Sequence, residues 1–143
     1  MFLVGVLSIV SVRAIESTLT RERRDHEADL LARGTAYRNA IRQYYLGGPG
    51  SAQSYPKELK ELLYDQRLTR PTRPLRKLYR DPMVRSGEWG LVHNEAGDLI
   101  GVYSLSKVRP VKRAGFPKEF ANFANAQRYS DWKFVYLPEQ EKL

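Results

Sequence analysis

The first twelve residues, MFLVGVLSIVSV, hold no charged side chain, and the first proline in the chain is Pro49. Large apolar side chains fill most of this run: Phe2, Leu3, Val4, Val6, Leu7, Ile9, Val10 and Val12. Twelve residues of helix extend about 18 Å, against a bilayer hydrocarbon core of roughly 30 Å. A chain built this way must cover an apolar helical end with lipid, with other copies or with its own body.

Three interpretations of this run remain open. A cleaved secretory signal would place a basic segment before the apolar stretch and a small-residue cleavage site after it. A helix buried in the core of the chain's own domain is the second interpretation. We favour the third, a membrane helix whose first residues precede Met1.

Residues 13–46 are predicted to form one long amphipathic helix of about 51 Å. Its second half repeats apolar or small residues at steps of three and four, which places them on one stripe: Leu30, Gly34, Tyr37, Ile41 and Tyr44. Its first half has no such stripe and mixes charges of both signs, with Arg23 and Glu27 spaced to pair. We therefore expect the first half to leave the body, and Gly47-Gly48-Pro49 to end the helix.

Charge is concentrated in one later stretch. The formal net charge is +8, and the 19 residues from Arg67 to Arg85 hold seven cations against Asp81 alone. Pro71, Pro74 and Pro82 favour an extended path there over a helix. We take its cations as candidates for binding an anionic partner: Arg67, Arg70, Arg73, Arg76, Lys77 and Arg80.

The remaining elements predict a small α+β body. Residues 88–93 and 99–105 are strand-like and flank Asn94-Glu95-Ala96-Gly97-Asp98, which indicates a hairpin. Short helices are expected over 55–63 and 116–127, and a last strand over 132–136, with Trp89, Tyr103, Trp132, Phe134 and Tyr136 in the core. The fold class is thus a long N-terminal helix laid across a small antiparallel sheet.

Residues suited to catalysis or metal binding are few. The chain has no cysteine and two histidines: His26, expected at the surface, and His93, expected at a turn or strand edge. Ser104 and Ser106 have no basic partner nearby in sequence. Asp81 is expected to cap a turn before Pro82, and Asp81 and Glu88 to meet arginines. We conclude that the chain is not an enzyme.

The order of several motifs resembles a known family. An apolar N-terminus running into a charged amphipathic helix, followed by YPKELKELL, LYRDPM, GEWGLV and GVYSLS, is similar to the pseudopilins of type II secretion systems, above all to the major subunit. These proteins are relatives of type IV pilins. The resemblance covers nearly the whole chain. It implies a pilin-like fold divided into an apolar segment over 1–12, an amphipathic helix over 13–46 and a globular domain over 47–143.

The resemblance implies a filament subunit of the bacterial inner membrane. Such a subunit crosses the membrane once, keeps its globular domain in the periplasm, and contacts other pseudopilin subunits, membrane lipid and an inner-membrane assembly platform. The apolar residues Phe2 to Val12 would form the anchor and fibre core. The helix charges would set the register between subunits, which makes these residues candidate subunit contacts: Arg21, Arg23, Arg24, Asp25, Glu27 and Asp29.

Two departures from the family pattern change the expectations. Comparison of the charged helices suggests about six further mature residues and a leader before Met1, which would give an apolar span of about 18 residues or roughly 27 Å. Many major pseudopilins also hold calcium in an Asp-rich C-terminal loop, whereas residues 106–113 here hold four cations and no acid. Calcium takes six to eight oxygen ligands, so we expect no cofactor.

An alternative function is a small basic module that binds nucleic acid through residues 67–85. Seven cations in 19 residues would suffice for phosphate contacts. Tyr79 is the one aromatic residue among them, and the stretch has no base-reading motif, so nucleic acid is the less favoured partner.

Overall fold

The computed structural model describes residues 2–50 and 52–142, with side chains described from Ser17 onward. One long helix, α1 (Phe2–Leu46), lies across an antiparallel sheet in the order β1-β2-β3. The strands are β1 (Trp89–His93), β2 (Leu99–Ser104) and β3 (Phe134–Val135). Four 3₁₀ helices complete the body: η1 (Leu59–Leu62), η2 (Lys118–Asn125), η3 (Tyr129–Asp131) and η4 (Pro138–Lys142). The fold class is α+β, as predicted.

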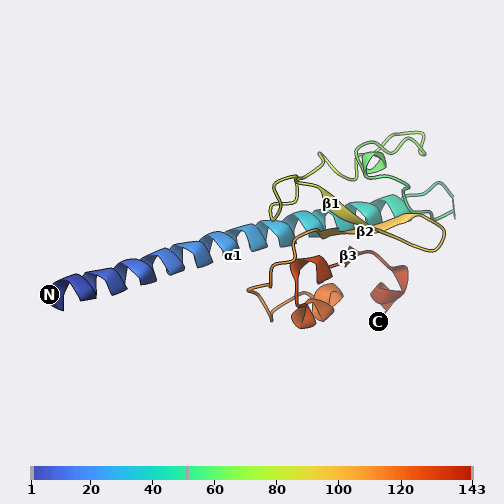
Figure 1. Ribbon diagram of the computed structural model, residues 1–143. Helices are drawn as coiled ribbons and strands as arrows, with labels where there is room; N and C mark the ends of the chain where they lie inside the picture. Colours follow the sequence, from blue (N-terminus) through green and yellow to red (C-terminus); the bar gives the residue numbers. More distant parts are fainter. Residues whose placement is uncertain (1, 51, 143) are drawn as a thin grey trace.

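The C-terminal half of α1 is the central element of the core. The predicted stripe is confirmed, since Leu30, Tyr37 and Ile41 are almost fully buried and Gly34 is buried between them. The helix ends at Leu46, before Gly47-Gly48-Pro49, as predicted. Its N-terminal half extends away from the body, so the N-terminus lies at the far end of a long rod (Figure 1).

Gly34 brings α1 close to the sheet. A side chain at this position would overlap the ring of Phe134 on β3. Phe134 pairs with Val102 of β2, and both are completely buried. The missing side chain therefore lets the helix backbone sit directly on the aromatic ring, although glycine is unfavourable in a helix interior.

The predicted hairpin is confirmed between β1 and β2. In its turn, Asn94 N donates to Asp98 O and Gly97 N donates to Asn94 O, both at 3.0 Å, and Asp98 N donates to the Asn94 side-chain oxygen at 2.8 Å. Gly97 adopts a φ of +84° in that turn, a conformation that glycine reaches without strain.

Aromatic rings fill the space below the sheet. Trp132 stacks on Phe123 with ring centroids 5.4 Å apart, and Phe134 meets Phe123 edge to face at 5.2 Å. Trp132, Phe134 and Tyr136 are buried as predicted. Trp89 and Tyr103 were also expected in the core, but both are only half-buried, since Trp89 packs beside Tyr37 at the edge and Tyr103 lies under Lys133.

Several elements differ from their predicted form. Each expected short helix is a 3₁₀ helix: η1 is confined to Leu59–Leu62, and η2 is kinked at Phe120, which has φ −118° and ψ 23°. The last strand is shorter than 132–136, because Trp132 directly follows η3, although Tyr136 N still donates to Ile100 O. Residues 67–85 form neither helix nor regular strand among the described elements, as predicted from their prolines.

Candidate assembly surface

The N-terminal part of α1 is the most exposed region whose side chains are described. Every residue of 17–26 is exposed, and Leu19 keeps 58% of its surface in water. The candidate contact residues Arg21, Arg23, Arg24 and Asp25 lie on this segment, and Asp29 is exposed just beyond it. We call residues 17–26 the projecting segment, because they stand clear of the body (Figure 1).

The apolar candidates precede the projecting segment on the same helix. The side chains of Phe2, Leu3, Val4, Val6, Leu7, Ile9, Val10 and Val12 lie outside the described side chains, although their backbone belongs to α1. Within the part of the chain that the structure describes, no helix combines the length and the apolarity needed to cross a membrane.

Glu27 marks the point where α1 leaves the body. Unlike the other candidate contact residues, Glu27 is buried, and its carboxylate accepts hydrogen bonds from three donor groups. Val111 N donates at 2.8 Å, Lys112 N at 3.1 Å and the Tyr129 hydroxyl at 2.7 Å. The expected pairing of Glu27 with Arg23 is therefore wrong, since the carboxylate holds the loop of residues 106–115 against the helix.

Tyr129 depends on this contact electrostatically as well as geometrically. Burial raises the pKa of the Tyr129 phenol well above its usual value of 10.0, and its hydrogen bond to Glu27 raises the pKa further. The phenol consequently stays protonated and remains a donor across the physiological range.

The chemistry of the loop does not fit calcium. A calcium loop turns carboxylate and carbonyl oxygens toward the ion. Here two backbone N–H groups point inward, toward a carboxylate supplied by α1. Among the described residues no group of three or more acidic, histidine or cysteine side chains is placed to hold a metal ion.

The arginine-rich stretch does not form a single free patch. Arg67 turns inward, where it pairs with buried Asp65 at 2.7 Å and donates to the carbonyl of Tyr44 at 2.5 Å, near the end of α1. Its guanidinium also covers the Tyr44 ring at 3.5 Å. The hydrogen bond from Arg67 lowers the pKa of the Asp65 carboxyl. Arg67 is thus placed to hold the helix end rather than an external anion.

The other cations of the stretch are exposed along one side of the body. Arg73 donates to Arg76 O and Arg80 donates to Arg85 O, both at 2.8 Å, while the Lys77 ammonium lies 5.3 Å from the Tyr79 ring. The exposed candidates are Arg70, Arg73, Arg76, Lys77 and Arg80. They remain available to a partner, spread along the chain rather than gathered at one point.

Asp81 has a structural role. Its carboxylate accepts from Ser104 Oγ at 2.7 Å and from Leu105 N at 3.3 Å, and its second oxygen accepts from Met83 N at 2.9 Å. The turn-capping prediction is confirmed. The expectation that Asp81 meets an arginine is wrong, because the end of β2 supplies its partners.

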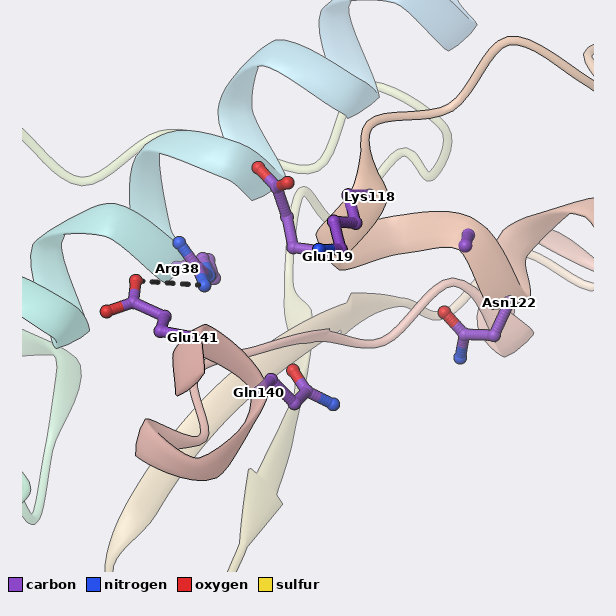
Figure 2. Close-up of a pocket in the computed structure, with 7 residues that line it drawn as sticks. Arg38, Lys118, Glu119, Asn122, Gln140 and Glu141 are labelled. Carbon is purple, nitrogen blue, oxygen red and sulfur yellow. Dashed lines mark ion pairs between the residues drawn. The ribbon is translucent and has the colours of Figure 1, made fainter. Parts of the chain in front are cut away.

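A groove of about 720 Å³ lies between α1, η2 and η4. Figure 2 shows Arg38 and Glu141 turned toward one another, with Lys118 and Glu119 on the η2 side. Arg38 lies 3.6 Å from Glu141, whose carboxylate also accepts from Arg42 Nε at 2.5 Å. The hydrogen bond from Arg42 lowers the pKa of Glu141. The groove therefore holds an ion-pair network that fastens the C-terminal turn to α1.

His26 is exposed on the projecting segment, and His93 lies at the end of β1 next to the hairpin turn, both as predicted. Searches against models of protein families, curated proteins and solved structures find no match to this chain.

Proposed function

We propose that this chain is a pseudopilin-like structural subunit of a type II secretion or type IV pilus-like fibre. The observation that carries the proposal is the form of α1. Its C-terminal half is built into the core, while residues 17–26 are exposed and lead to an apolar end. Among the residues whose side chains are described, α1 contributes to the buried core from Leu30 onward.

The length of the helix supports assembly by helix packing. At 1.5 Å per residue, the 45 residues of α1 extend about 67 Å, and its exposed half can lie beside the same half of another copy. An apolar run of this kind loses contact with water only in lipid or among neighbouring helices. The subunit would thus be held in the bacterial inner membrane, its body in the periplasm, until an inner-membrane platform transfers it into the fibre.

The mixed charges of the projecting segment would then set the stagger between copies. Arg21, Arg23 and Arg24 alternate with Glu22 and Asp25 over five residues, and all are exposed. Relative positions of two such helices that bring like charges opposite one another would be disfavoured, and those that bring opposite charges together would be favoured. The proposed role is structural and requires no catalytic group.

Membrane retention in bacteria tests the proposal. Val6→Asp or Leu7→Lys places a charge in the apolar run, which costs about 2.5–3.5 kcal/mol at the centre of a membrane helix. We expect either variant to leave the membrane fraction and to stop forming cross-linked oligomers, while the body keeps its near-UV circular dichroism. Leu19→Asp is the matched control for membrane retention of Val6→Asp, since it adds the same negative charge on the exposed segment of the same helix.

Two outcomes would overturn the proposal. One is retention of both charged variants in the membrane fraction. The other is a wild-type chain that stays monomeric in aqueous buffer and binds duplex DNA with a steep dependence on salt, because that result would favour the nucleic-acid module.

A further inference from the structure

A second group of cations surrounds the point where α1 leaves the body. The loop of residues 106–115 is fastened there by the bonds from Val111 and Lys112 to Glu27. Four of its side chains and one beyond it are basic, and we call them the rim patch: Lys107, Arg109, Lys112, Arg113 and Lys133. All are exposed except Lys112, which is half-buried.

None of the ion pairs identified among the described residues involves a cation of the rim patch. Residues 106–115 contain no acid. The ammonium groups of Lys112 and Lys133 lie over the rings of Phe116 and Tyr103 at 5.1 and 3.3 Å. The carboxylate of Asp131 accepts from the backbone N–H groups of Gln127 and Arg128.

Burial lowers the pKa of the Lys133 ammonium. The negative charge of Asp131 raises this pKa, and the positive charge of Lys107 lowers it further. Repulsion between Lys107 and Lys133 is consistent with a patch in which like charges gather. Such an arrangement is stabilised when an anionic surface covers it.

Apolar side chains accompany the cations. Leu105 and Val108 keep 38% and 47% of their surface exposed, and they alternate in sequence with Lys107 and Arg109. Exposed basic and aliphatic side chains together are typical of segments that lie at the headgroup level of a bilayer.

We propose that the rim patch binds the headgroups of anionic phospholipids beside the anchored helix. This inference rests on the proposed function, since it places the apolar end of α1 in the same bilayer. An acidic lipid surface fits better than an acidic peptide, because the patch combines cations with exposed aliphatic side chains, and the grooves identified among the described residues are lined by other side chains.

The geometry adds a condition. The 15 residues between Val12 and Glu27 extend about 22 Å along the helix axis. Electrostatic attraction is largely screened beyond about 8 Å at physiological salt. The patch therefore reaches the headgroups only when α1 is inclined toward it, so the subunit should lean to one side on an anionic bilayer and stand free on a neutral one.

The absence of cysteine permits a direct test with the full chain. Ala114→Cys places a single fluorescent label in the exposed loop, and Ala96→Cys places the matched label in the exposed hairpin turn. Each labelled chain is added to phosphatidylcholine vesicles with and without phosphatidylglycerol, all carrying a headgroup quencher. We expect quenching at position 114 to rise at least twofold with phosphatidylglycerol and to fall back at about 1 M salt, where the screening length is about 3 Å. Position 96 should not respond.

Charge reversal identifies the residues responsible. Arg109→Glu with Arg113→Glu should abolish the response at position 114, since each cation near an anionic surface changes affinity about fivefold. Arg70→Glu with Arg76→Glu is the control, because it changes net charge equally on exposed arginines of the other basic region. This pair should keep the response.

The outcomes separate the two proposals. Equal quenching at position 114 in both lipids, from a chain that still sediments with vesicles, overturns the rim patch and leaves the anchored subunit intact. Loss of the response in the Arg70 and Arg76 pair likewise overturns it, in favour of the arginine-rich stretch. A chain that sediments with neither vesicle overturns both proposals.

Discussion

Replacing Glu27 with glutamine tests whether one carboxylate fastens the loop to the helix. The substitution keeps the shape of the side chain and removes its charge. A hydrogen bond to a charged group contributes about 1.5–3 kcal/mol, against about 0.5–1.5 for a neutral pair. Three donors, Val111 N, Lys112 N and Tyr129 Oη, rely on this carboxylate. At about 1 kcal/mol for each, Glu27→Gln should lower the free energy of unfolding by about 3 kcal/mol.

Urea unfolding followed by tryptophan fluorescence measures this loss, because Trp132 packs against Tyr129 with ring centroids 5.2 Å apart. Hydrogen exchange gives the local readout: the amides of Val111 and Lys112 should lose protection before the core does. Glu22→Gln, the same change on an exposed residue of the projecting segment, should stay within about 0.5 kcal/mol of wild type.

Metal removal supplies a second arm of the same experiment. Since the loop amides already donate to a carboxylate, calcium or a chelator should leave the unfolding midpoint of the wild-type chain unchanged. The reasoning would be refuted by a Gln variant with wild-type stability and protected loop amides. A wild-type chain that needs calcium for those protected amides would refute it equally.

Two further predictions concern the body. Gly34→Ala should lower the free energy of unfolding in urea by about 1–3 kcal/mol, because the added Cβ overlaps the Phe134 ring. At a helix position with free space, the same change from glycine to alanine stabilises by about 1 kcal/mol. A gain in stability would mean that the helix does not sit on that ring. Burial raises the pKa of Tyr37 from 10.0 to about 12, so the folded state favours the neutral phenol, and stability should be complete below pH 10 and decline as the pH rises toward 12. Phenolate absorbance measured with the unfolding midpoint checks this, and titration of all tyrosines at the ordinary value without loss of stability would contradict it.

Elements could be predicted from the sequence wherever they depend on residues that are close together in the chain. The steps of three and four from Leu30 to Tyr44 specify one buried helix face, and the Asn94–Asp98 turn specifies the hairpin, since both patterns act within a few residues. The exposed charges of the projecting segment were predicted for the same reason: without an apolar stripe, a helix has nothing to pack.

The partners of buried charges could not be predicted in this way. Glu27 lies 84 residues from Val111 and 102 from Tyr129, and Arg67 reaches back 23 residues to Tyr44 O. Both carry charges that a sequence pattern assigns to solvent. One signal was present for Glu27, which continues the Leu30 stripe by a step of three and faces a later loop that lacks any acid. The 3₁₀ helices η3 and η4 escaped prediction because their three and five residues are too few to show a periodicity.

Because α1 is one continuous helix, the number of residues in it sets the direction in which the body points around the helix axis. With no proline between Phe2 and Leu46, each residue contributes about 100° of rotation and 1.5 Å of rise. A single residue inserted in 17–26 would swing the body about a quarter of a revolution around the rod, whereas seven residues would return it to within about 20° of its starting direction. Changes of length in this segment are therefore compatible with an unchanged outer face only when they complete a nearly whole number of turns, as about seven or about eleven residues do.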